Sequence, residues 1–239
     1  MKGETILDEA ICLEIRPWSK TSHVVTWLTR GNGVVKTSVK GAIRPKSAFL
    51  GQYDLHYTCQ IVYYASARGE LHMLKEVTPI EMREKLRTRW RETSLAGYAA
   101  KLSGRLATAG TEEWYRAHSR LLDSLARRQP PYPLLGELLH FELEILRLAG
   151  LAPDLSGAPA DTLSVPFAIE SGKVGESGRI LRLDQSAIQA MASGKVATES
   201  AILAALRFVG IFMRWHLDVD GTGRRLLIPL LRQTPHHAP

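Results

Sequence analysis

Residues 31–64 read GNGVVKTSVKGAIRPKSAFLGQYDLHYTCQIVYY and contain two strand-like patterns joined by a long loop. In the second pattern polar and apolar side chains alternate, which is the period of a half-buried antiparallel strand. Its apolar face comprises Tyr53, Leu55, Tyr57, Cys59, Ile61 and Tyr63. The Gly31-Asn32-Gly33 sequence before the first pattern tolerates positive φ and indicates a tight hairpin turn. This stretch therefore predicts that the chain begins with antiparallel β-structure.

Three more segments with the same alternation flank this stretch. They are residues 6–16, 22–30 and 70–78. The chain is thus expected to form five short strands between about residue 5 and residue 78, with a long loop between the third and the fourth. This arrangement predicts a Greek-key barrel of the OB type, or an SH3-like barrel.

Helical periodicity replaces the alternation after residue 78. Thr78, Pro79 and Glu81 have the spacing of a capping box with proline at the first helical position, which predicts a helix to about residue 107. Further helices are expected at residues 112–127, 134–150, 184–193 and 198–217.

The region between the third and fourth of these helices has a different composition. Residues 151–183 are rich in Gly, Ser, Pro and Ala, and are expected to form irregular loops with room for two short strands. The predicted fold class is therefore α+β: a five-stranded OB-type β-barrel domain, residues 1–78, followed by an α-helical domain, residues 79–239.

Composition limits the possible cell compartment and partners. The only cysteines are Cys12 and Cys59, both in strand-like apolar patterns, as expected for buried, reduced thiols of a cytoplasmic protein. The acidic N-terminal segment differs from a signal peptide, and no apolar run reaches the ~18 residues that span a bilayer. A net charge of +7 and a pI of about 9.5 favour a polyanionic partner.

The positive charge is concentrated in residues 15–53, which contain no Asp or Glu. The cations in this segment are Arg16, Lys20, Arg30, Lys36, Lys40, Arg44 and Lys46. Lys36, Ser38 and Lys40 alternate with Val35, Thr37 and Val39, so the first three are expected to project from the outer face of one strand, with the two lysines roughly 13 Å apart. A surface that serves only solubility mixes both signs of charge. The segment therefore predicts binding to nucleic-acid phosphates, at Lys36, Lys40, Arg44 and Lys46 above all.

Two further features extend this predicted interface. Trp18, Trp27, Phe49 and Tyr53 lie nearby in the sequence and are candidates for base stacking, although each is also a candidate core residue. The segment REKLRTRWR places Arg83, Arg87 and Arg91 on one stripe of the predicted helix from residue 79, so Arg87 is included among the candidate DNA-binding residues.

Several motifs resemble the bacterial RecO family of recombination mediators. The barrel segment matches the family pattern through Lys40, Gly41, Ala42, Arg44, Pro45, Lys46 and Ser47. The segment LLHFELEILRLAGLAPDL resembles a family helix through Phe141, Glu142, Gly150, Pro153 and Leu155. The segments RFVGIFMRWHLD and GRRLLIPLL lie where the family has its last long helix and a basic, apolar tail.

This resemblance implies a cytoplasmic, nucleoid-associated DNA repair and recombination protein of the RecF pathway. Such a protein binds single- and double-stranded DNA and anneals complementary strands coated with single-strand-binding protein. It works with RecR and helps to load RecA, without a cofactor and without bond-breaking catalysis. The acidic, apolar tail of single-strand-binding protein is expected to bind between helices, around Phe141 and Arg147 or near Arg224 and Arg225.

One departure from the family concerns zinc. Many members carry a four-cysteine zinc site in the loops after the Gly-x-x-Pro helix, whereas residues 151–183 here contain neither Cys nor His. We therefore expect no metal site. Because no apolar run is long enough to span a bilayer, we also expect no membrane association.

Two alternatives to a DNA-binding mediator remain open from the residues. An RNA-binding barrel module, such as a ribosome or tRNA factor, would use the same phosphate contacts. An enzyme is disfavoured, since the chain lacks a glycine-rich phosphate loop, a nucleophile elbow and a His-Glu-x-x-His helix. The pair His140 and Glu144 lies in so apolar a segment that a structural role is expected.

Overall fold

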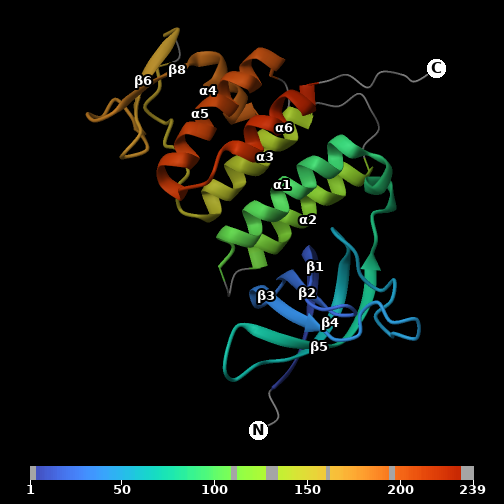
Figure 1. Cartoon of the computed structure of the whole chain (residues 1–239). Coiled ribbons are helices and arrows are strands. Elements are labelled where there is room, and N and C mark those ends of the chain that lie inside the picture. The colour runs from blue at the N-terminus through green and yellow to red at the C-terminus, as the bar shows by residue number, and fades with distance from the viewer. Residues whose placement is uncertain (1–3, 109–111, 128–133, 160–161, 194–196, 233–239) are drawn as a thin grey trace, which may run out of the picture. The chain divides into compact units, whose positions relative to one another are not determined.

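The computed structural model describes residues 4–108, 112–127, 134–159, 162–193 and 197–232. Its contacts divide the chain into two compact units, residues 1–128 and 129–239. In Figure 1 the first unit runs from the blue N-terminal strands into the green helices, and the second from yellow-green to red.

Five strands of the first unit close into a barrel, which confirms the predicted OB-type fold. The hydrogen-bonded order is β1-β2-β3-β5-β4; β3 and β5 run parallel, and the other neighbouring strands run antiparallel. The strands are β1 (Thr5–Pro17), β2 (His23–Thr29), β3 (Gly33–Val39), β4 (Thr58–Tyr64) and β5 (Leu71–Glu81).

The barrel core follows the predicted alternation along β4. Cys59, Ile61 and Tyr63 are buried together with Trp27 of β2, whose indole N–H donates to the Thr37 hydroxyl at 2.8 Å. Leu55, by contrast, is exposed, because the chain enters β4 only at Thr58.

The predicted turn between β2 and β3 is present. Gly33 has a φ of +67°, a conformation that a residue without Cβ adopts at little cost. The Asp8 carboxylate of β1 accepts hydrogen bonds from the Gly31 N–H and from the Asn32 side-chain amide, the latter at 2.7 Å. The turn is thereby held against β1.

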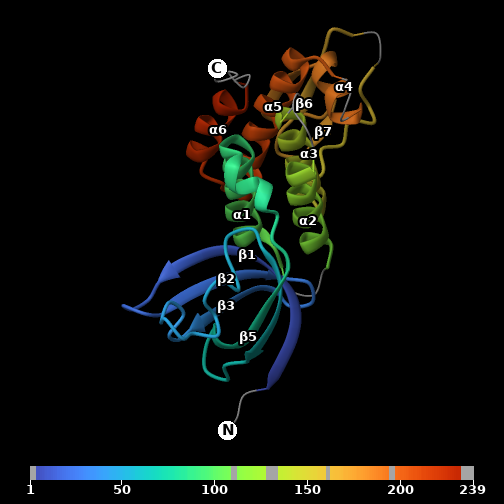
Figure 2. The same ribbon diagram turned by 90° about the vertical axis from the view of Figure 1, so that its right-hand side faces the viewer.

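Two helices, α1 (Trp90–Leu106) and α2 (Glu112–Arg127), pack on the barrel. Figures 1 and 2 show them side by side over the β1 and β2 side of the strands. Gly104 of α1 lies against the buried side chain of Leu13 on β1. The compact unit therefore extends to residue 128, whereas the expected barrel domain ended at residue 78.

The predicted start of the first helix is wrong. Thr78 and Pro79 belong to β5, which pairs with β4 as far as Glu81, and Pro79 lies next to a bulge where no ladder N–H is required. A 3₁₀ helix, η1 (Glu84–Thr88), follows, and α1 begins only at Trp90. The apparent capping box is thus the end of a strand.

The second unit contains four helices and a small sheet among the described residues. The helices are α3 (Leu134–Leu148), α4 (Gln185–Ser193), α5 (Glu199–Leu217) and α6 (Thr222–Arg232). The sheet has the order β7-β6-β8, with β6 (Ser164–Ala168), β7 (Lys173–Val174) and β8 (Ile180–Asp184). The predicted α3, α4 and α5 are present, whereas α6 and the third strand were not anticipated.

An aromatic cluster joins the sheet of the second unit to α5. The Phe167 ring of β6 meets the rings of Phe208 and Phe212 edge-on, at centroid distances of 4.8 and 5.8 Å. By length and composition α5 alone among the described helices resembles a membrane span. Its buried face packs on the sheet, α3 and α4, which is typical of a core helix.

A buried ion pair joins three helices of this unit. The Arg224 guanidinium of α6 lies 2.6 Å from the carboxylate of Glu142, which is fully buried in α3, and also donates to the Leu206 carbonyl of α5. A Cβ on Gly210 would clash with this guanidinium, so glycine is required where α5 passes it. The pair fixes α6 in place.

In the first unit a buried arginine joins the barrel to α2. Arg83 follows β5 with a φ of +48°, and its side chain donates to the His56 carbonyl and to the Thr58 hydroxyl, the latter at 2.9 Å. The same guanidinium pairs with Asp123 of α2 at 2.9 Å. The buried guanidinium of Arg83 therefore links the barrel to α2.

Two buried histidines lie near this arginine. Burial lowers the pKa of His56 to about 4, with the positive charge of Arg83 as a second cause. Burial also lowers the pKa of His118 to about 3, and the ring lies 3.0 Å from the Ser103 hydroxyl. Both rings are therefore neutral in the folded chain at neutral pH.

We predict that the first unit loses stability as the pH falls below 6.5. Above that pH these histidines are neutral in both folded and unfolded chains; below it only the unfolded chain takes up the protons. The free energy of unfolding should fall by up to about 2 kcal/mol per histidine between pH 6.5 and 5. Urea unfolding of the full chain across this range measures the effect. A His56→Gln, His118→Gln variant should show a weaker pH dependence, and an equally steep one would contradict the assignment.

Candidate nucleic-acid interface

The turn between β1 and β2 is hydrogen-bonded to the loop that follows β3. The Gly41 N–H donates to the buried Ser22 hydroxyl at 3.2 Å, and the Ile43 N–H donates to the Thr21 carbonyl at 3.4 Å. Strand register places Pro17 opposite His23 on β2. It places Val39 opposite the same histidine. The two connections therefore meet at one end of the barrel.

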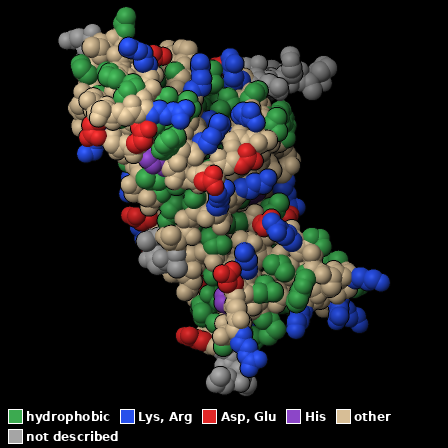
Figure 3. Space-filling view, turned by 60° about the vertical axis from the view of Figure 1, so that its left-hand side comes forward, with side chains coloured by type: hydrophobic (Ala, Val, Ile, Leu, Met, Phe, Trp, Pro, Cys, Tyr) green, Lys and Arg blue, Asp and Glu red, His purple; other side chains and the backbone are tan. Residues whose placement is uncertain are grey.

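This end collects cations from both connections. We call the group formed by Arg16, Lys20, Lys40, Arg44 and Lys46 the basic end; all five residues are exposed. Consecutive turns hold the loop part of the group, with hydrogen bonds from the Arg44 N–H to the Gly41 carbonyl and from the Ser47 N–H to the Arg44 carbonyl. Figure 3 shows Lys and Arg side chains projecting from the barrel, in the lower part of the view.

The basic end is poor in neutralising carboxylates. Within the described parts of the chain, Lys20, Lys40, Arg44 and Lys46 take part in no ion pair, whereas Arg16 pairs with Glu14 at 2.8 Å. The exposed cations therefore keep their charge available for an external anion.

Lys36 lies four residues before Lys40 on β3. It is exposed between buried Val35 and Thr37, as the strand pattern predicts, and no described residue pairs with it. Ser38 differs from the prediction: it is buried, and its hydroxyl donates to the His72 carbonyl of β5, because β3 and β5 pair here. The exposed side chains here are therefore those of Lys36 on β3 and Lys40 just after it, whereas Ser38 is buried.

Two predicted interface residues, Arg30 and Arg87, form ion pairs with carboxylates. Arg30 is in the turn between β2 and β3, at the other end of these strands, and pairs with Glu112 of α2. Arg87 pairs with Asp54 at 2.6 Å and lies over the Tyr57 ring.

The predicted helical stripe of arginines is also wrong. Arg83 is buried before η1, Arg87 lies in η1, and Arg91 lies in α1, so the three do not share one helix. Arg83 lies between β5 and η1 and has a positive φ, so regular secondary structure is interrupted there.

Of the four candidate stacking residues, the fold leaves one well exposed. Trp27 is fully buried, and Phe49 and Tyr53 pack against the barrel core. Tyr53 also shares a hydrogen bond of 2.8 Å with the His23 ring. Trp18, at the start of the β1–β2 turn, is 54% exposed.

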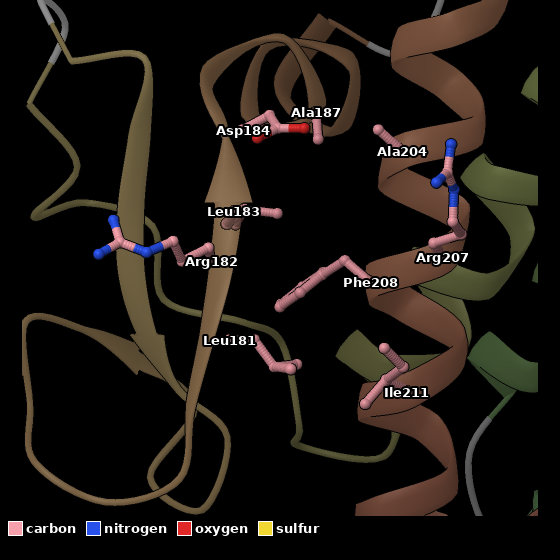
Figure 4. A pocket seen from close by; sticks show the side chains of 9 residues that line it. All are labelled: Leu181, Arg182, Leu183, Asp184, Ala187, Ala204, Arg207, Phe208 and Ile211. Atoms are coloured by element: carbon pink, nitrogen blue, oxygen red, sulfur yellow. The ribbon is translucent and has the colours of Figure 1, made fainter.

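The second unit has a pocket of about 190 Å³ between β8, α4 and α5. Figure 4 shows Leu181, Leu183, Phe208 and Ile211 directed into the space between β8 and α5. Arg182 extends from the opposite side of β8, away from this space, and Arg207 lies against α5. The two arginines are exposed, and neither forms an ion pair with a described residue. Sequence analysis missed this pocket because its walls come from a strand and a helix whose contact it could not assign.

Most residues expected to form the groove for the acidic tail are buried or paired. Phe141 is 2% exposed and belongs to the core, and Arg147 pairs with Glu144 on its own helix. Arg224 is bound by the buried carboxylate of Glu142. Arg225, which was also expected beside the groove, is exposed.

The zinc site of many RecO proteins does not fit this chain. Residues 151–183 contain neither Cys nor His, and no three His, Cys, Asp or Glu side chains gather around a possible metal position in the described residues. Strand pairing and the Phe167 contacts stabilise this region instead.

Comparison with known proteins supports the resemblance seen in the motifs. Residues 1–83 match the family model described as "Recombination protein O N terminal". A DNA repair protein RecO from Rhodopirellula baltica is 30% identical over 150 residues, which are 60% of this chain and 53% of that protein. RecO from Xylella fastidiosa strain M23 is 31% identical over 159 residues, 64% of this chain and 63% of that protein.

A third relative extends the similarity into the second unit. RecO from Salinibacter ruber is 25% identical over 238 residues, 94% of this chain and 82% of that protein. The alignments with the other two span only about half to two thirds of those relatives. Together the matches confirm the predicted resemblance to RecO.

Proposed function

We propose that this chain, whose N-terminal domain is that of the RecO family, acts in DNA repair by holding DNA through its phosphates at the basic end. The observation that carries the proposal is the gathering of five exposed cations from the end of β1 and two connections, four of them without an ion pair among the described residues. Lys36 extends the contact along β3.

Phosphate contact of this kind does not depend on base sequence. Each neutralised phosphate releases condensed counterions, so the affinity falls steeply with salt concentration. A protein that holds two strands by their backbones reduces their repulsion and leaves the base edges free to pair. We propose on this basis that the chain binds single- and double-stranded DNA and anneals complementary strands.

The same protein is proposed to work by binding rather than by catalysis. Lysines and arginines of the basic end supply charge, and burial raises the pKa of the Cys59 thiol to about 12 and that of Cys12 well above its usual value. Such thiols are poor nucleophiles.

In the cytoplasm, the chain would act with RecR to help load RecA onto strands coated with single-strand-binding protein.

A variant with Lys36, Lys40, Arg44 and Lys46 changed to Ala tests the phosphate contacts. We predict that its affinity for a single-stranded oligonucleotide falls, and that the slope of log K against log salt is reduced by about 0.7 for each phosphate that the variant no longer neutralises. Strand annealing should slow in parallel. Fluorescence anisotropy over a salt series measures the first effect.

An Arg30→Ala, Arg87→Ala variant is the matched control, since both arginines are exposed but paired with carboxylates. Its affinity and salt slope should stay close to wild type. Unchanged DNA binding in the four-residue variant would contradict the proposal. Tighter binding to RNA than to DNA of equal length would favour the alternative, an RNA-binding module.

We further propose that the pocket between β8 and α5 receives the acidic, apolar tail of single-strand-binding protein. Its apolar walls suit a hydrophobic side chain. Arg207, which forms no ion pair with a described residue, suits an acidic group beside that side chain, while Asp184 adds one negative charge to the lining. This location replaces the groove that the sequence led us to expect.

The tail proposal predicts a loss of peptide affinity in an Arg207→Ala variant. Removing this charge should weaken the binding of a peptide with the acidic tail composition several-fold, most strongly at low salt. Calorimetric titration of the full chain measures this. Arg225→Ala on α6 is the control: a loss in that variant alone would place the contact on α6 and contradict the proposed pocket.

A further inference from the structure

Trp18 is a large aromatic side chain that the fold holds at the basic end without burying it. Its backbone N–H donates to the Ser22 carbonyl at 2.8 Å, which closes the β1–β2 turn. Ser22 in turn accepts from Gly41, so the turn is joined to the cation-bearing loop. Trp18 is 54% exposed, although burying a side chain of this size would be favourable.

The surroundings of Trp18 combine positive charge with apolar surface. Arg16 and Lys20 flank it in sequence, and Ile43 of the adjoining loop is 51% exposed. Residues 15–53 contain no Asp or Glu. An exposed ring between cations offers a face for a base and charges for the phosphates on either side of it.

We propose that Trp18 is a base-stacking residue that gives the basic end a preference for single-stranded over double-stranded DNA. The inference rests on the proposed DNA-binding function and adds a source of strand selectivity to it. An unpaired base presents its face at little cost, whereas in a duplex the neighbouring pairs cover that face and must first be unstacked. Phosphate contacts alone do not make this distinction.

The charge around Trp18 favours a nucleic-acid strand over a protein partner. Charges across an interface are complementary, and the cations of the basic end are of one sign, so the occupant is expected to be anionic. Each exposed cation of the basic end other than Arg16 lacks an ion pair within the described chain. A polyanion with apolar faces is the occupant that matches both properties.

The test compares Trp18→Ala and Trp18→Phe with wild type on four ligands. These are a single strand, a duplex and an abasic strand of equal length, and the acidic tail peptide. We expect Trp18→Ala to lose roughly 5- to 100-fold in single-strand affinity, to bind duplex and abasic strand as wild type does, and to keep its salt slope. Trp18→Phe should retain most of the affinity.

Trp90→Ala is the matched control, because Trp90 is 55% exposed in the same unit but lies at the start of α1. It should bind the single strand as wild type does. Equal losses on single, abasic and duplex DNA in Trp18→Ala would overturn the stacking role, as would unchanged single-strand binding or a loss confined to the peptide. Failure of the phosphate contacts would be distinguishable, since it would show in the lysine variant and its salt slope.

Discussion

The hydrogen bonds from Gly41 and Ile43 to the β1–β2 turn are the contacts on which the proposed function depends. They bring two connections that are about twenty residues apart in sequence to one end of the barrel. Because Gly41 has a φ of +68°, the chain can leave β3 sharply and reach Ser22. Together with the strand register, this junction places Lys20 at the same end of the barrel as Lys40 and Arg44.

Cations gathered in this way repel one another, so the barrel must supply the stability that opposes the repulsion. Its closed ladder, the buried Trp27–Thr37 hydrogen bond and the covering helices α1 and α2 do so. Arg83 and Asp123 add a charged link between barrel and helix. Carboxylates of the first unit pair with Arg30 and Arg87, whereas Lys20, Lys40, Arg44 and Lys46 form no ion pair among the described residues. The contacts that stabilise the first unit and the cations proposed to bind DNA are thus made by different residues of that unit.

Local patterns predicted most of the fold but not its long-range contacts. Alternation identified the barrel strands, and helical periodicity identified α2, α3 and α5, since these patterns depend on nearby residues. Thr78-Pro79 was misread because pairing with β4 outweighed a local capping signal. Lys36, Lys40, Arg44 and Lys46 were placed correctly as exposed, whereas the ion pairs of Arg30 and Arg87 bridge residues that sequence spacing cannot relate. The pocket at Phe208 was missed for the same reason.

The central claim is that DNA lies against the basic end of the barrel. Lysine acetylation of the full chain, followed by mass spectrometry with and without a bound oligonucleotide, tests it directly. The account predicts that DNA protects Lys20, Lys36, Lys40 and Lys46 while Lys75 and Lys85, which lie on β5 and η1, stay reactive. Equal protection of all lysines, or protection confined to Lys75 and Lys85, would contradict it.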